Sequence, residues 1–347
     1  MGGKETALLD LMICRIPNLK GAERITLQKK FDRQDEFSSL SKHDIEGIIG
    51  RQVKGRSWTM DSVRAAAEED ASIALKRGIR HVSWRSGEYP PLLREIYDPP
   101  AVLFYRGSLP NPEKPLVAVV GTRKPSSAAS ACAYKLALDL GKAGLSVVSG
   151  LALGIDAMAH RGGIDSGAAT FAVLGSGVDN VYPASNRHVA RRLLETGGAL
   201  MSEYPPQTPP LKGNFPARNR IISALARGTV IVEAPEKSGA LITAKFALEQ
   251  GRDLWVYSVG GTASVCASNG TASSGASNAG AARLAADGAG IIKSARDILA
   301  EWNIFAAELK AETQANTGST GAAGNDLACS LADDLGFELK SSSEEKE

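Results

Sequence analysis

The sequence has few of the residue patterns on which catalytic and metal sites usually depend. Its cysteines (Cys14, Cys132, Cys266 and Cys329) are far apart and show no metal-ligand spacing, and no histidine has a Glu-x-x-His partner. A Gly-x-Ser-x-Gly nucleophile elbow and a Walker sequence are also absent. A metalloenzyme, a serine hydrolase and a P-loop ATPase are therefore poor interpretations, and the pattern favours binding over catalysis.

Net charge and long apolar runs are limited as well. The formal net charge is only +2 over 347 residues, so attraction to a polyanion must come from local clusters of basic residues. No apolar run reaches the roughly 18 residues that a membrane span requires. With scattered cysteines and no recognisable signal peptide, we expect a soluble protein of the reducing cytoplasm, without metal, cofactor or membrane contact.

A repeated strand-then-helix pattern fills most of the chain. Apolar runs without alternation, as expected for strands buried on both faces, occur at 117–120, 146–149, 170–174, 229–233 and 254–256, with a weaker one at 199–202. Helix-period segments separate them near 127–142, 155–166, 186–196, 219–226 and 238–250. This order predicts an α/β fold with a doubly wound, mostly parallel sheet, whose ligand sites lie at the carboxyl ends of the strands.

The flanking regions differ in composition. Residues 1–75 read as a small helical domain, similar to a SAM or helix-hairpin-helix unit, in which the turn from Pro17 to Gly21 either contacts DNA or only joins two packed helices. Short strands are expected at 79–84 and 101–105, and the α/β domain extends over 79–303. A flexible Gly/Ala/Ser insert is expected at about 258–282, and a disordered acidic tail over 310–347.

Basic residues concentrate between positions 180 and 228. Seven of them, against Glu195 and Glu203 only, lie there: Arg187, Arg191, Arg192, Lys212, Arg218, Arg220 and Arg227. Arg191 and Arg192 fit a solvated helix face. Arg218 and Arg220 flank an asparagine, which we place at a turn after Pro216, and there they predict a site for a phosphate-rich ligand.

The loops after the strands carry the remaining signals. Gly121-Thr122-Arg123 has one glycine where a dinucleotide-binding fingerprint has three. The loop from Ser149 to Asp156 contains Gly150 and Gly154, which either let helix amides approach an anion or only let the helix pack closely on the sheet. Asp156 is expected to be structural or orienting.

Taken in order, eight motifs resemble the bacterial DNA-processing protein A (DprA/Smf) family. They are Gly121-x-Arg123, Ser149–Asp156, Gly175-x-Gly177, Tyr182-Pro183, Ser202–Pro205, Phe215–Ser223, Val232-Glu233-Ala234 and Ser238–Ala244. The resemblance runs from about 79 to 259 and resumes at 283–299. It implies an extended Rossmann-like, non-enzymatic protein that binds single-stranded DNA, forms a homodimer and helps load RecA recombinase in natural transformation.

The resemblance also implies roles for individual residues. Arg123, Arg218 and Arg220 would contact phosphates, Asn219 would hydrogen-bond backbone or base, and Phe215 would either stack on a base or anchor the turn. The further DNA-binding candidates are Arg187, Lys245, Ser149 and Gly150. Glu233 is expected to order the arginines by charge-assisted hydrogen bonds.

Two departures and one rival interpretation remain. The Gly/Ala/Ser insert interrupts the family pattern, and the acidic tail lacks the apolar content of the winged-helix domain with which many members end. The rival is a nucleotide hydrolase similar to lysine-decarboxylase-like phosphoribohydrolases. Its glutamate would fall at position 246, which is Phe246 here.

Overall fold

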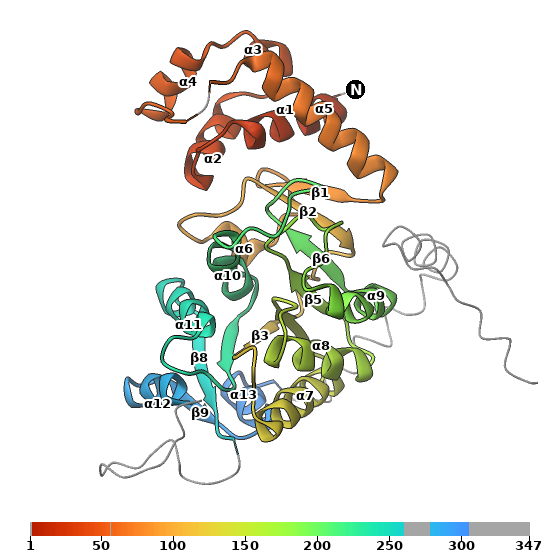
Figure 1. The fold of residues 1–347 in the computed structure, drawn as a ribbon, viewed down its shortest axis with the longest axis vertical. Helices are drawn as coiled ribbons and strands as arrows, with labels where there is room; N and C mark the ends of the chain where they lie inside the picture. The colour runs from red at the N-terminus through yellow and green to blue at the C-terminus, as the bar shows by residue number, and fades with distance from the viewer. Residues whose placement is uncertain (1, 56, 260–277, 305–347) are drawn as a thin grey trace, which may run out of the picture.

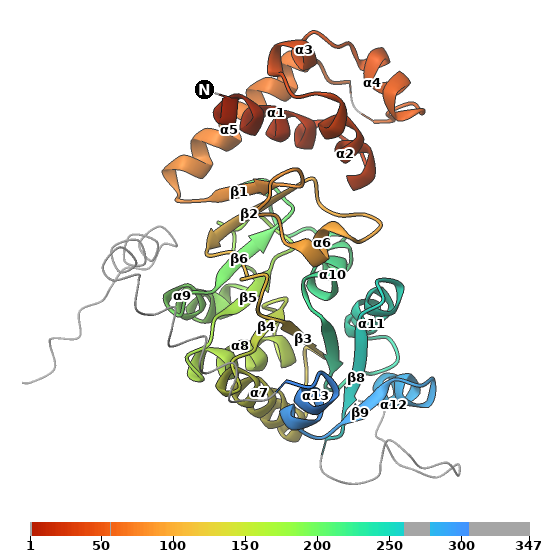
Figure 2. The ribbon, with the colours of Figure 1, turned by 180° about the vertical axis from the view of Figure 1, so that it is seen from behind.

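The computed structural model describes residues 2–55, 57–259 and 278–304. Within these ranges five helices come first and form one end of the molecule (Figures 1 and 2). They are α1 (Gly2–Arg15), α2 (Gly21–Lys30), α3 (Gln34–Ser38), α4 (Lys42–Ile49) and α5 (Met60–Lys76). The described part of the first 75 residues is thus made of helices joined by turns.

A single mixed sheet follows the helices. In the described residues it has nine strands in the order β1-β2-β6-β5-β4-β3-β7-β8-β9. Their bounds are β1 (Arg80–Ser83), β2 (Val102–Gly107), β3 (Leu116–Val120), β4 (Ser146–Ser149), β5 (Thr170–Val173), β6 (Ala199–Ser202), β7 (Gly228–Ile231), β8 (Asp253–Tyr257) and β9 (Gly290–Ile292). β1 and β2 pair antiparallel, β2 joins β6 antiparallel, and every other pairing is parallel.

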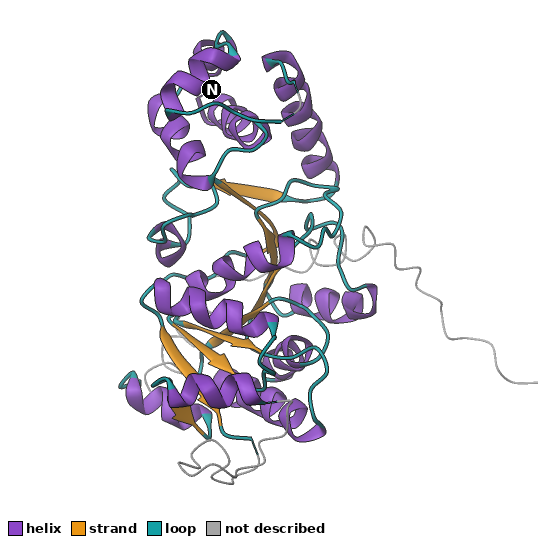
Figure 3. Ribbon diagram, turned by 60° about the vertical axis from the view of Figure 1, so that its left-hand side comes forward, coloured by secondary structure: helices purple, strands orange, loops and turns teal. Residues whose placement is uncertain are grey.

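Helices cover both faces of this sheet (Figure 3). They are α6 (Pro91–Arg94), α7 (Ser127–Lys142), α8 (Ile155–Asp165), α9 (Arg187–Glu195), α10 (Asn214–Leu225), α11 (Gly239–Glu249), α12 (Ala279–Ala286) and α13 (Ala295–Glu301), with a 3₁₀ turn η1 (Ala184–Asn186) before α9. The doubly wound, mostly parallel α/β architecture predicted from the sequence is confirmed.

Strand β3 shows why the sequence pattern lacks alternation. Val117 and Val119 pack with α7, α8 and α13 on one face, while Ala118 and Val120 pack with α10, α11 and α12 on the other. All five residues of β3 are buried. A strand covered on both faces needs apolar side chains at every position, which produces the continuous run seen in the sequence.

The N-terminal helices share a core with the sheet. Leu9, Leu27 and Phe37 belong to the same buried cluster as Phe104 of β2 and Leu200 of β6. Polar contacts add to this packing, since Arg85 Nη2 lies 2.8 Å from Asp10 Oδ1 and Gln28 Nε2 donates to the Ala101 carbonyl at 3.1 Å.

The turn from Pro17 to Gly21 faces the chain itself. The Gly21 amide donates to Asp98 Oδ1 at 2.9 Å, and the Lys20 amide donates to Glu23 at 2.8 Å. Arg51 Nη2 also donates to the Asn18 carbonyl at 2.8 Å. Because these groups already have partners, the geometry favours the alternative in which the turn joins packed helices.

The expected insert and tail lie mostly outside the described residues. Near the end of the range expected for the insert the chain forms α12, which begins at Ala279, and β9 and α13 follow. No helix in the described part of the chain is long and apolar enough to cross a membrane.

Candidate functional site

The parallel strands end at one edge of the sheet, and the winding direction changes between β3 and β7. From β3 the chain continues through β4, β5 and β6 on one side, and β7, β8 and β9 extend the other side. The loops that leave β3 and β7 therefore diverge at this switch point, the place where doubly wound sheets commonly bind ligands. The loop that carries Arg123 leaves β3 at this point.

Glu233, just after β7, accepts hydrogen bonds from the loop that carries Arg123. Its buried carboxylate accepts hydrogen bonds from Ser126 Oγ at 2.6 Å and from the Ser126 amide at 3.2 Å, and its carbonyl accepts from the Thr122 amide at 2.8 Å. Ser126 in turn caps α7 by accepting from the Ala129 amide. The expectation that Glu233 orders arginine side chains is wrong, because it orders the loop backbone instead.

Arg123 itself is exposed and contacts an aromatic ring. Its guanidinium carbon lies 5.7 Å from the centroid of Phe215, within the range of a cation–π contact. Phe215 is partly buried and lies over Gly175, where a Cβ atom would come within 3.0 Å of the ring. Phe215 thus anchors the first turn of α10; that it also stacks on a base stays a prediction.

Helix α10 begins earlier than the sequence pattern indicates. It starts at Asn214 rather than near position 219, so Pro216 lies in its first turn, where a missing amide hydrogen costs little. Arg218 and Arg220 consequently lie within a helix and not at a turn, and both are buried.

Arg218 points into the protein beneath the strand ends. It is 3% exposed, and its Nη1 donates to the carbonyls of Gly150, at 2.9 Å, and of Val173. Burial lowers the pKa of Arg218 to about 10, against the raising effect of Asp156, so the guanidinium stays charged at neutral pH. The prediction that Arg218 contacts phosphate is wrong for this structure, because its charge is used inside the fold.

Arg220 points to the opposite side of α10 and is also held internally. Its guanidinium lies 2.6 Å from Glu203 and 3.2 Å from Asp98, and it donates to the Asp98 carbonyl at 2.9 Å. Although burial opposes the shift, Glu203 and Asp98 raise the pKa of Arg220. With 9% of its surface exposed, Arg220 is an ion-paired structural residue here, and its assignment as a phosphate contact is wrong for this structure.

The loop after β4 is filled by its own carboxylate. Asp156 Oδ2 accepts from the amides of Gly150 at 3.1 Å and Ala152 at 3.4 Å, so an internal carboxyl group lies where one of the two interpretations placed a ligand anion. Burial raises the pKa of Asp156, and the Arg218 charge opposes that shift. A Cβ atom at position 150 would lie 2.7 Å from Arg218 Nη2, so this glycine makes room for the arginine.

Ser149 has a structural position. It is fully buried, and its Oγ donates to the Val119 carbonyl at 2.7 Å. The structure therefore corrects the assignment of Ser149 and Gly150 as DNA contacts: neither the Ser149 hydroxyl nor the Gly150 amide is free for a ligand, because both donate to groups within the fold.

The remaining candidates, Arg187, Asn219 and Lys245, belong to three different helices. Arg187 is exposed at the start of α9, next to Asn186, which bonds the Leu151 and Ala152 carbonyls of the β4 loop. Asn219 Nδ2 donates to the Gly239 carbonyl at 3.2 Å and ties α10 to the start of α11. Lys245 is exposed, pairs with Glu249 at 3.6 Å, and lies ~9 Å along α11 from its first residue. The structure thus places Arg187 at the same edge as Arg123, and Lys245 further away.

Three exposed side chains at this edge were not among the predicted site residues. Lys124 follows Arg123, Lys212 precedes α10, and Tyr182 lies beside Phe215 with ring centroids 5.6 Å apart. In the described ranges neither lysine forms a salt bridge. The sequence could have indicated these residues, because they lie in the loops after predicted strands or just before a predicted helix. Such loops lie at the carboxyl edge of the sheet, where ligands bind.

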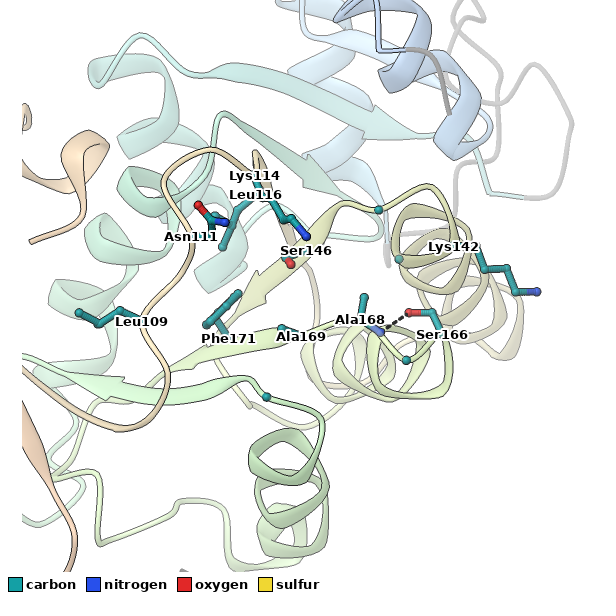
Figure 4. A pocket seen from close by; sticks show the side chains of 14 residues that line it. Leu109, Asn111, Lys114, Leu116, Lys142, Ser146, Ser166, Ala168, Ala169 and Phe171 are labelled. Carbon is teal, nitrogen blue, oxygen red and sulfur yellow. Dashed lines mark hydrogen bonds between the residues drawn. The ribbon is translucent and has the colours of Figure 1, made fainter. Parts of the chain in front are cut away.

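A pocket in the described part of the chain lies elsewhere. It encloses about 530 Å³ and is lined by residues at the amino ends of β3 to β6, among them Leu116, Ser146 and Phe171 (Figure 4). Lys142 borders it but points away from it (Figure 4). We assign the site to the opposite, carboxyl edge, because cations and an aromatic ring gather there, as in proteins that bind single strands.

Fold and site together define a doubly wound α/β protein with a basic, aromatic rim at the carboxyl edge of its sheet. The family model described as DNA recombination-mediator protein A matches residues 80–303, and the chain belongs to that family. The Smf protein of Borreliella burgdorferi is 33% identical over 294 residues, covering 85% of this chain and 88% of that protein. The Smf protein of Synechocystis is 48% identical over 172 residues, and there the match spans only 43% of the relative.

Solved structures agree with this assignment. The X-ray structure of DNA processing protein A from Streptococcus pneumoniae has a TM-score of 0.61 and 32% identity, covering 86% of this chain and 95% of that one. The single-stranded DNA-binding DNA processing protein A of Helicobacter pylori has a TM-score of 0.54 and 27% identity, covering 64% of this chain and 95% of that one.

Proposed function

We propose that this chain binds single-stranded DNA along the carboxyl edge of its sheet, without preference for base sequence. The observation that carries the proposal is the Arg123 guanidinium, exposed at the switch point and seated over the Phe215 ring. Proteins that bind single strands without sequence preference combine cations that follow the phosphates with aromatic faces on which bases stack. Membership of the family, and the single-stranded DNA binding of the Helicobacter pylori protein, support the same ligand.

Exposed cations extend this site beyond Arg123. Lys124 belongs to the same loop, Lys212 precedes α10, and Arg187 starts α9. Three acidic groups in the segments around this edge are buried or paired, since Asp156 and Glu233 accept internal hydrogen bonds and Glu203 pairs with Arg220. The rim therefore offers positive charge to a ligand without competing exposed carboxylates from these residues.

The test is an equilibrium titration of single-stranded and double-stranded oligonucleotides across a salt series. Arg123→Ala is expected to weaken single-strand binding for all base sequences alike and to lower the salt slope by about 0.7 to 1, the contribution of one phosphate contact. Arg64→Ala, which removes an exposed arginine from α5, is the matched control and should bind as the unmodified chain does. Equal affinity of the Arg123 variant and the unmodified chain at every salt concentration would contradict the proposal.

The finer parts of the function are proposals as well. We infer that the chain acts as a homodimer in the cytoplasm and helps load RecA recombinase on incoming DNA during natural transformation. Light scattering after size-exclusion chromatography tests the dimer. RecA filament formation on DNA coated by a single-strand binding protein, with and without this chain, tests the loading.

We do not expect catalysis at this site. The rival phosphoribohydrolase would need a carboxylate at position 246, and Phe246 lies there, partly buried in α11. Incubation with AMP followed by chromatography for free adenine tests this rival, and release of base at a catalytic rate would overturn the binding-only proposal.

A further inference from the structure

Tyr182 and Phe215 form a pair of neighbouring rings at the carboxyl edge of the sheet. Their centroids are 5.6 Å apart and their planes are inclined by 46°. Phe215 also contacts the Arg123 guanidinium, so one cation and two rings meet from the loops after β3, β5 and β6. All three segments lie at the carboxyl edge of the parallel strands.

Tyr182 is more exposed than Phe215 and packs less against the rest of the fold. Phe215 lies over Gly175 and fixes the first turn of α10, whereas Tyr182 keeps 46% of its surface exposed. Its hydroxyl makes no hydrogen bond within the described part of the chain. A large aromatic side chain that is nearly half exposed on a cationic rim is typical of a stacking surface, since its apolar body gains from being covered.

The loop that carries Tyr182 is firmly held. Ser176 Oγ donates to the Asn180 carbonyl at 2.6 Å, and the Gln207 amide donates to Asp179 at 2.9 Å. On the other side of Tyr182, buried Asn186 donates to the carbonyls of Leu151 at 2.9 Å and Ala152 at 3.1 Å. A ring presented by an ordered loop loses little conformational freedom on binding, so most of the stacking free energy contributes to affinity.

We propose that Tyr182 is a base-stacking residue of this site, and that it holds an unpaired nucleobase next to the one that meets Phe215 and Arg123. The inference rests on the proposed function, because it assigns a contact within the same single-strand site. Stacking acts through the ring and not through the hydroxyl, and it concerns the base and not the phosphate. These two properties separate Tyr182 from a residue that acts through charge or through the fold.

The test compares two ligands of equal charge: an oligothymidylate of about 15 nucleotides and an abasic oligonucleotide of the same length. Tyr182→Ala is expected to weaken oligothymidylate binding about tenfold or more and to leave binding of the abasic strand unchanged. Tyr182→Phe keeps the ring and should bind both ligands as the unmodified chain does. Arg123→Ala should weaken both ligands, because it removes a phosphate contact.

A second tyrosine supplies the control. Tyr97 is 94% exposed beside α6, so Tyr97→Ala removes an exposed ring without touching the loops of the site. Thermal melting of every variant shows whether the fold is intact. Unchanged oligothymidylate binding by Tyr182→Ala overturns the inference, and so does an equal loss on the abasic strand. If the unmodified chain fails to bind oligothymidylate at all, the proposed function itself fails with it.

Discussion

The arginines of α10 and those at the carboxyl edge of the sheet carry the same charge but differ in their surroundings. Arg218 and Arg220 are buried and surrounded by carbonyls and carboxylates of the fold, whereas Arg123 and Arg187 are exposed on short loops or at a helix start. The difference teaches that a dense cluster of basic residues in the sequence can serve the core. The charge that we propose for the ligand comes from exposed positions, namely Arg187 within the same cluster and Arg123 outside it.

Helix geometry explains the separation within α10. Residues two apart on a helix point about 200° away from each other. Arg218 therefore reaches the ends of β4 and β5, while Arg220 reaches Glu203 and Asp98 on the other side. Since α10 is covered on both of these sides, neither guanidinium faces solvent.

The largest effect on stability is expected for Arg218→Met. The substitution leaves the Gly150 and Val173 carbonyls without this donor and removes the cation nearest to buried Asp156. Breaking a buried charge network in this way costs about 3–5 kcal/mol, to be measured by urea unfolding. A fully stable Arg218→Met variant that no longer binds single-stranded DNA would instead place Arg218 among the ligand contacts.

Arg220→Gln is expected to cost somewhat less, about 2–3 kcal/mol, because hydrogen bonding to Asp98 can partly persist. A double-mutant cycle with Glu203→Gln isolates the pair, whose guanidinium and carboxylate lie 2.6 Å apart. The coupling should change little with salt, since the pair is largely buried. Additive effects of the two substitutions would mean that the ion pair does not stabilise the fold.

A smaller effect is expected from His160, buried in α8 near Arg218. Burial, assisted by the Arg218 charge, lowers the pKa of His160 to about 3, and Nδ1 lies 2.9 Å from Thr170 Oγ1. The unfolded chain binds this proton near pH 6.5 and the folded chain does not, so stability is lost as pH falls below 6.5, by ~1.4 kcal/mol per unit. His160→Leu should flatten this dependence between pH 6.5 and 5 relative to the parent chain. Burial also lowers the pKa of His81, which contributes equally in both proteins.

The smallest effect on stability is expected for Arg123→Ala and Arg187→Ala. Both side chains are exposed, so the free energy of unfolding should stay within about 0.5 kcal/mol of the parent value. Measured beside the DNA titration, this separates loss of a ligand contact from loss of the fold. A loss of more than 1.5 kcal/mol for Arg123→Ala would place it with the structural arginines of α10.

The fold could be predicted largely from local patterns. The elements and their order can be predicted from the Val-rich runs, the segments between them and the helical pattern of the first 75 residues. The connection rules of parallel sheets then indicate the topology. The start of α10 could not be predicted, because Gly213 precedes it without a side-chain cap and Pro216 reads as a helix boundary.

The site could be predicted less completely, for a physical reason. The partners of Arg220 lie 17 and 122 residues away in the sequence, and the carbonyls that bind Arg218 belong to two other strands' ends. Burial of a cation depends on these distant partners, which no local pattern reveals. Arg123, by contrast, lies two residues after Gly121 in the loop that follows β3, and its exposure agrees with that position.

The hydrogen bonds of Glu233 limit the length of the loop that carries Arg123. Its carbonyl accepts a hydrogen bond from the Thr122 amide and its carboxylate accepts one from Ser126 Oγ. The segment between these two residues is therefore fixed at both ends by a single residue just after β7. An insertion there would break one of these two sets of hydrogen bonds, and Arg123 would then lose its contact with the Phe215 ring. The length of this short loop is therefore as constrained as the identity of the arginine it carries.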